Sequence, residues 1–147
     1  MPVRLETELG LSRIDAEISL TSGALIGGEF GVDAGSKHGE IGLKFIDSPL
    51  DSVLRCHAET TVGAVEVELD SAFEGTYSLQ TLFVTRLSPQ RNAKDPAGRG
   101  RRRVIVRNDA HGRVEGELRW VESDGNSSNN DGYVVLKSLV PSVKLIV

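Results

Sequence analysis

The segment Val62–Thr81 constrains the fold of this chain more than any other feature of the sequence. In its first half Val65, Val67 and Leu69 fall on one face, and acidic residues stand between them. Alternation with a period of two is typical of a strand that is buried on one side. A short glycine-containing turn and a second alternating stretch complete the segment. It therefore predicts two β-strands joined by a turn.

The same alternation recurs along the chain and predicts further strands. They are expected over residues 14–20, 24–32, 41–45, 54–58, 65–69, 76–84, 103–107, 113–120, 133–136 and 143–147. Tyr77, Leu79 and Phe83 are expected to point into the core from their strand. No stretch of ten or more residues has the periodicity of an amphipathic helix. We therefore expect an all-β chain without significant helix.

Length and composition predict one domain over residues 1–147. A chain of this size can bury a core without disulfides or metal ions. Aromatic residues are few, so the core is expected to consist mostly of Val, Leu and Ile. The strand and turn pattern recurs at intervals of roughly 20 residues, which is typical of stacked repeats. We therefore favour a β-solenoid over the alternative, a β-sandwich, which would give nearly the same pattern.

Two segments interrupt the alternation and are expected to be loops. Residues 86–102 form a basic excursion, and residues 123–132 form a polar loop. The whole chain has a net charge of −4, but the window Arg86–Arg107 contains eight basic residues and a single acid, Asp95. That window therefore carries +7 and the remainder −11. Such an asymmetric charge distribution affects association more than it affects the fold.

An arginine cluster in this window is the strongest candidate site. It comprises Arg99, Arg101, Arg102 and Arg103. Guanidinium groups suit bidentate contacts with phosphate, sulfate or carboxylate. No aromatic residue is interleaved with the arginines and the rest of the chain is acidic, so nucleic acid is disfavoured as a partner. The expected anion is a carboxylate of a second copy, which predicts a homo-oligomer formed through the basic loop. Contacts within one chain are the alternative.

The sequence contains no pattern that predicts catalysis by a thiol or by a metal ion. Cys56 and His57 are adjacent, and neighbouring residues of a strand point to opposite faces, so they cannot form a dyad with each other. Cys56 is expected to be a small buried thiol. His38, His57 and His111 lack the spacing of metal ligands, and the polar loop lacks the register of a calcium loop. No metal ion and no cofactor are expected.

Carboxylates and aromatic residues are weaker candidates. Two carboxyl groups on neighbouring strands are what a glycosidase requires, and the chain offers Glu66, Glu68, Glu115 and Glu117. Alternating Glu on a solvated strand face also discourages edge pairing, and this interpretation is favoured. Trp120 shares its parity with Val114 and Leu118, which predicts a core residue rather than a platform for a sugar. Tyr77 and Tyr133 are interpreted in the same way.

Four stretches of the chain carry a resemblance to a known family: TSGALIGGEF, HAETTVGAVEVELDSAFEGTYSLQT, DPAGRGRRR and GRVEGELRW. They resemble the fungal adhesin-like domains of unknown function, which are similar to bacterial adhesin β-solenoids. The similarity extends from about residue 12 to the end of the chain. The resemblance implies a fold and a fungal origin. It implies no activity and no catalytic residues.

By analogy, the resemblance to adhesin-like domains favours a non-catalytic binding module that recognises a glycan or another surface ligand in a lectin-like or adhesin-like manner. The sequence does not identify the residues that bind this ligand. Self-association would make weak sites multivalent. A structural self-assembly domain is the first alternative, and an enzyme that uses surface carboxylates is the second. The chain shows neither an apolar signal segment nor a membrane-spanning stretch, so we expect a cytoplasmic location and no membrane partner.

Overall fold

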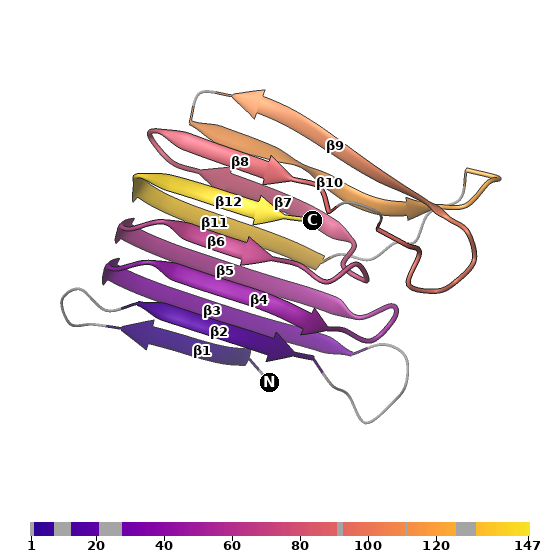
Figure 1. Cartoon of the computed structure of the whole chain (residues 1–147), viewed down its shortest axis with the longest axis horizontal. Coiled ribbons are helices and arrows are strands. Elements are labelled where there is room, and N and C mark those ends of the chain that lie inside the picture. Colours follow the sequence, from indigo (N-terminus) through magenta and orange to yellow (C-terminus); the bar gives the residue numbers. More distant parts are fainter. Residues whose placement is uncertain (1, 8–12, 21–27, 91–92, 111, 126–131) are drawn as a thin grey trace.

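The computed structural model describes residues 2–7, 13–20, 28–90, 93–110, 112–125 and 132–147, and in these ranges it contains two β-sheets (Figure 1). The seven-stranded sheet contains β1 Pro2–Thr7, β3 Glu29–His38, β5 Val53–Val62, β7 Gly75–Gln80, β9 Arg102–Ala110, β10 Arg113–Val121 and β11 Gly132–Val140. The five-stranded sheet contains β2 Ile14–Ser19, β4 Ile41–Asp47, β6 Val65–Glu68, β8 Val84–Ser88 and β12 Ser142–Ile146. The all-β prediction is confirmed.

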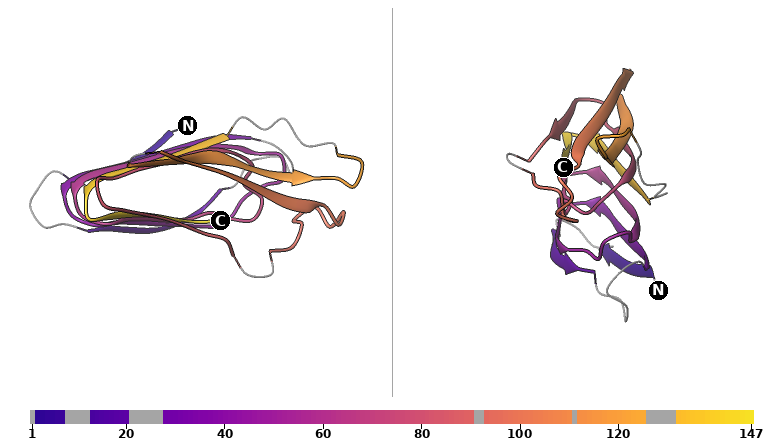
Figure 2. Two further views of the ribbon diagram at one scale, coloured as in Figure 1. Left: turned by 90° about the horizontal axis from the view of Figure 1, so that it is seen from above. Right: turned by 90° about the vertical axis from the view of Figure 1, so that its right-hand side faces the viewer.

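The chain passes back and forth between the two sheets. Strands β1 to β8 alternate between them, and β11 and β12 make one more pass. The seven-stranded sheet has the order β1-β3-β5-β11-β7-β10-β9, and the five-stranded sheet has the order β2-β4-β6-β12-β8. Pairing is parallel throughout except around β10, which lies antiparallel to both β7 and β9. The sheets form two layers joined by turns, as Figure 2 shows.

The core fills the space between the layers with the inward residues of each strand. Because the parallel strands are in register, side chains of one face form rows across the sheet. One such row in the seven-stranded sheet consists of Val32, Cys56, Val134 and Tyr77, all buried. Burial of these rows on one side explains the alternation that the sequence displays.

The turns at one end of the molecule share a hydrogen-bonding pattern. Thr60 Oγ1 donates to the Gly39 carbonyl at 3.0 Å, and Ser138 Oγ donates to the Gly63 carbonyl at 2.6 Å. Gly63 has φ +147°, and a Cβ there would collide with the backbone of Gly39. Stacked turns of this kind therefore need both a glycine and a buried hydroxyl.

The structure does not show the β-solenoid that the sequence favoured, and it resembles the alternative, a β-sandwich, more closely. The two sheets pack face to face, and the arrangement is closer to a sandwich. Strands β11 and β12 lie between β5–β6 and β7–β8, so the order in space is not the order in the chain. The hairpin of β9 and β10 adds antiparallel pairing at the end of one sheet. Periodicity along the sequence gives the spacing of strands but not their neighbours, which is why it did not predict this insertion.

Most elements follow the predicted strands, with three departures. No strand was predicted where β1 lies, and β3 covers Glu29–His38 instead of residues 24–32, of which 24–27 lie outside the described residues. The segment Val62–Thr81 contains two strands, β6 and β7, but they belong to different sheets. Tyr77 and Leu79 are buried as predicted. Phe83 is not: it lies in the turn between β7 and β8 and is 69% exposed. The basic excursion is shorter than expected, because β8 extends to Ser88 and β9 begins at Arg102.

Candidate functional site

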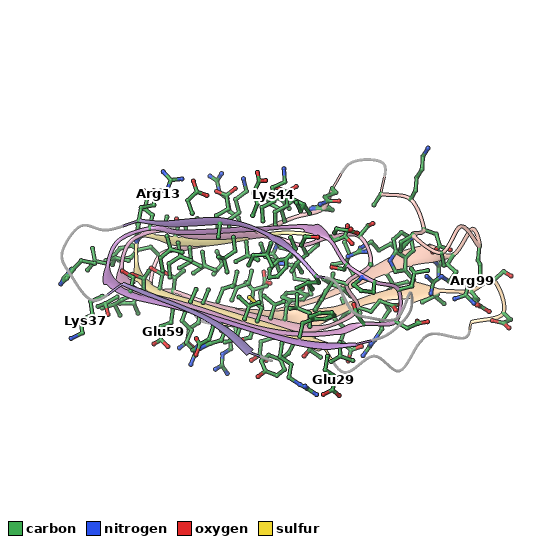
Figure 3. The ribbon with its side chains drawn as sticks, turned by 90° about the horizontal axis from the view of Figure 1, so that it is seen from below. Arg13, Glu29, Lys37, Lys44, Glu59 and Arg99 are labelled. Atoms are coloured by element: carbon green, nitrogen blue, oxygen red, sulfur yellow. The ribbon has the colours of Figure 1, made fainter. Side chains whose placement is uncertain are left out.

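The outer face of the seven-stranded sheet, turned away from the five-stranded sheet, gathers the most varied side chains. Register places Gly31, Arg55 and Tyr133 in one row across β3, β5 and β11. The next row consists of Asp33, His57 and Val135. Glu29 and Glu59 project from this face in Figure 3, whereas Arg13 and Lys44 project from the opposite face of the molecule. The sheet therefore presents an ordered polar surface above a buried core.

The first hollow lies over β3, β5 and β11 and has a volume of ≈ 720 Å³. Its lining includes Glu29, Asp33, Arg55 and His57. Arg55 Nη1 lies 3.6 Å from a carboxylate oxygen of Glu29. His57 Nδ1 lies 3.4 Å from Asp33, and its Nε2 lies 3.4 Å from Glu59. Arg55 and His57 therefore each lie within 3.6 Å of a carboxylate that also lines this hollow.

Tyr133 forms the boundary of the first hollow. Its neighbours Gly132 and Val134 are buried, while Tyr133 is 40% exposed. Gly31 lies in the same row and has no side chain, which leaves room beside the row. An exposed aromatic ring with a polar tip, mounted on a buried strand, is a feature of binding surfaces.

The second hollow lies on the same face, over β7, β9, β10 and β11, with a volume of ≈ 410 Å³. It is lined by Thr76, Ser78, Asn108, Glu115 and Glu117 among others, and it shares Tyr133 and Val135 with the first hollow. Arg113 Nη1 lies 3.2 Å from Glu115, and Arg119 Nε lies 4.0 Å from Glu117. Tyr133 therefore stands between two polar hollows.

Sequence reasoning assigned Tyr133 to the core, and this prediction was wrong. The alternation of side chains along β11 places Tyr133 on the outer face of the sheet. Val134 and Leu136 are fully buried, so Tyr133 and Val135 must face outward. By contrast, Trp120 is buried as predicted and is 2% exposed. The two aromatic residues received the same interpretation, although even-numbered residues point into the core in both strands and Tyr133 is odd-numbered.

The arginine cluster is largely engaged within the chain. Arg101 makes a salt bridge with Asp95, with its Nη2 2.8 Å from the carboxylate, and both side chains are almost fully buried. The backbone N–H groups of Ala97, Arg99 and Arg101 also donate to this carboxylate. The hydrogen bonds from Arg101, followed by those from the backbone, hold the pKa of Asp95 well below its usual range. Asp95 therefore organises the loop around itself.

The other members of the cluster differ in exposure. Arg103 donates from Nη1 to the Ser71 carbonyl at 2.9 Å, and its guanidinium lies 5.1 Å from the centroid of the Trp120 ring. Arg99 lies 3.1 Å from Glu122, on the surface. Arg102 is exposed. Contacts within one chain, the alternative considered from the sequence, are thus present, while binding of an external anion stays a prediction centred on Arg102.

The remaining candidates are dispersed. Cys56 points into the core, and burial raises its pKa to about 12, so its thiol is unsuited to nucleophilic attack. Glu66 and Glu68 lie on β6 and Glu115 and Glu117 lie on β10, so the two carboxylate pairs belong to different sheets. These two pairs therefore do not meet in one site.

Metal ligands do not gather in the described part of the chain. No group of three or more His, Cys, Asp or Glu residues in it is arranged to hold a metal ion. His57 contacts carboxylates, and His38 is exposed at the end of β3. His111 and most of the polar loop lie outside the described residues. Within the described ranges there is also no helix long and apolar enough to cross a membrane.

Comparisons with protein families, curated proteins and solved structures give no match to this chain. Its function is therefore inferred from its own residues.

Proposed function

We propose that this chain is a non-catalytic binding module that recognises a saccharide on the outer face of the seven-stranded sheet. The observation that carries the proposal is the position of Tyr133, an exposed ring between two polar hollows. An aromatic ring offers a flat apolar face to the C–H groups of a pyranose, while hydroxyl groups require donors and acceptors nearby. The first hollow supplies both through Arg55, His57 and Asp33.

Rigidity supports this function. The strands beneath the outer face carry fully buried residues on their inner side, including Ala34, Cys56, Ala58 and Val134. Side chains mounted on such strands lose little further freedom when a ligand binds, which favours affinity.

The proposal is tested by removing the ring. Tyr133→Ala should bind glycans at least about tenfold more weakly than the unaltered protein, a loss of about 1.4 kcal/mol. Binding would be located on a glycan array and then measured by isothermal titration calorimetry. Phe83→Ala is the matched control, because Phe83 is also an exposed aromatic residue but lies in a turn away from the outer face. Equal affinity of both variants would contradict the proposal.

A structural self-assembly domain is the second candidate function. It is favoured by exposed apolar side chains at the end of the molecule that carries the turn between β7 and β8. Leu82 and Phe83 are each 69% exposed, and Leu139 is 50% exposed. The Leu82 N–H donates to the Leu139 carbonyl at 3.3 Å, so these residues adjoin one another. Adjoining exposed apolar residues are typical of surfaces that contact another protein.

A further inference from the structure

The two hollows adjoin each other across the strands. They share Tyr133 and Val135, so both lie beside these residues on the same face, and we call the surface from one hollow to the other the path. Along this path the register aligns one outward residue from each strand in the order Gly31, Arg55, Tyr133, Thr76, Glu117 and Val106. A ligand that followed this row would therefore run perpendicular to the strands and meet a new side chain at every strand.

The spacing of the row restricts the shape of such a ligand. Neighbouring strands lie about 4.8 Å apart, which is close to the advance per sugar in an extended chain of β-1,4-linked pyranoses. Successive sugars of that chain would each meet the next strand. A coiled polysaccharide, such as an α-1,4-linked glucan, does not keep this advance along a straight line.

The charges of the path restrict the chemistry of the ligand. The second hollow is lined by the carboxylates of Glu115 and Glu117 and by no basic side chain, although Arg113 and Arg119 contact these carboxylates from beside it. The first hollow adds Glu29 and Asp33 beside Arg55 and His57. An anionic chain, with a carboxylate or sulfate on each sugar, would meet carboxylates in both hollows and would compete with them for the basic groups that they already contact.

We infer that the ligand is an uncharged, extended polysaccharide that lies across the strands over Tyr133 and occupies both hollows. This inference rests on the proposed function and names its substrate class. Tyr133 stacks on a central sugar, and the sugars on either side form hydrogen bonds in the two hollows. Affinity should therefore grow with chain length until both hollows are filled.

Chain length provides the first test. Cellohexaose and chitohexaose, measured by isothermal titration calorimetry, should bind at least about tenfold more tightly than their disaccharides if sugars occupy both hollows. Maltohexaose is the coiled control, and a hexamer of galacturonic acid is the anionic control. Both controls should bind more weakly than the better of the two extended hexamers. Tighter binding of the acidic hexamer would overturn the assignment to an uncharged ligand.

A substitution in the second hollow provides the second test. Ser78→Ile keeps a residue that suits a strand and fills the floor of this hollow. It should lower the affinity for the hexamer about tenfold and leave the affinity for the disaccharide unchanged. Gln80→Ile is the matched control, because Gln80 faces the same way on β7 but lines neither the first nor the second hollow. The control should bind like the unaltered protein.

The two proposals fail in different ways. If the hexamer and the disaccharide bind equally and Ser78→Ile has no effect, the extended ligand is wrong, while saccharide binding at Tyr133 stands. If neither extended hexamer binds but a short or branched glycan does, the same conclusion follows. If no glycan binds and Tyr133→Ala changes nothing, both proposals fall.

Discussion

Gly116 has no side chain and so leaves space for the side chain of Tyr77, which extends from β7 past β10 to β9. It lies on the inward face of β10, opposite Tyr77 on β7 and Arg107 on β9. The Tyr77 hydroxyl reaches past it and donates to the Val106 carbonyl at 2.6 Å. A Cβ at Gly116 would collide with that carbonyl and would stand 2.6 Å from the tyrosine hydroxyl. By making room for this hydrogen bond, Gly116 allows Tyr77 to link the β9–β10 hairpin to the core of the sheet.

Gly116→Ala should therefore destabilise the protein by about 1–3 kcal/mol, the usual cost of overpacking a core. The measurement is the midpoint of unfolding in guanidinium chloride. Gly35→Ala is the matched control: Gly35 also lies within a strand, and a Cβ there would meet no atom within 4 Å. The control should change stability by no more than about 0.5 kcal/mol. Equal effects of the two substitutions would contradict the role assigned to Gly116.

At the same scale, parity determined which residues could be predicted. Trp120, Tyr77 and Cys56 are buried because each continues an alternation that the sequence shows clearly. Tyr133 is the second residue of its strand, so few preceding strand residues establish its face. The contact between Tyr77 and Val106 joins residues that are 29 positions apart, and no local pattern encodes it.

At the scale of elements, the basic loop is built around one carboxylate. Asp95 accepts hydrogen bonds from three backbone N–H groups and from the Arg101 side chain. The sequence displays the excess of arginine but not this arrangement, because it depends on backbone N–H groups that converge only when the loop folds. The cluster therefore looked like a site for external anions, whereas much of it serves the loop.

Asp95→Asn should loosen this loop and lower stability by up to about 3 kcal/mol, because it leaves a buried guanidinium without its counter-charge. Hydrogen exchange of the Ala97, Arg99 and Arg101 amides should accelerate, while exchange in the core strands should change less. Asp109→Asn is the matched control. Its partner Arg107 is 2.7 Å away, but both side chains are exposed, so its loss should cost no more than about 1 kcal/mol.

The same carboxylate gives the loop a dependence on pH. The pKa of Asp95 is lower in the folded chain than in the unfolded chain, so its contribution to stability is complete above the unfolded pKa of about 3.9. It is lost as the pH falls from there through the folded pKa. Asp95→Asn should remove this part of the acid sensitivity. Identical acid unfolding of the two proteins would show that Asp95 has no such role.

At the scale of the whole molecule, the sequence predicted the type of secondary structure better than the order of the strands in the sheets. Strand positions followed from alternation, and the absence of helical periodicity agrees with the described residues. The placement of β11 between β5 and β7 did not follow, because any inward face of Val and Leu can pack beside any other. The outer face likewise needed the structure, since Arg55 and Tyr133 are neighbours only through this insertion.

Two ends of the molecule offer surfaces for self-association, and salt should distinguish them. The basic loop lies at one end, and the turn with Leu82 and Phe83 lies at the other (Figure 1). The Debye length falls from about 30 Å at 0.01 M salt to about 3 Å at 1 M. Association through the loop should therefore weaken with salt, whereas burial of apolar side chains is not screened.

We expect association through the apolar end, because the loop arginines are largely engaged within the chain. Sedimentation across this range of salt should then show oligomers that persist at 1 M. Leu82→Ser combined with Phe83→Ser should yield monomers, because it removes the two most exposed apolar side chains of that end. Arg102→Ser, the matched change at the opposite end, should leave the oligomers intact. Oligomers that dissociate at high salt and are absent in Arg102→Ser would instead place the contact at the basic loop. A monomer under all conditions would contradict association through either end.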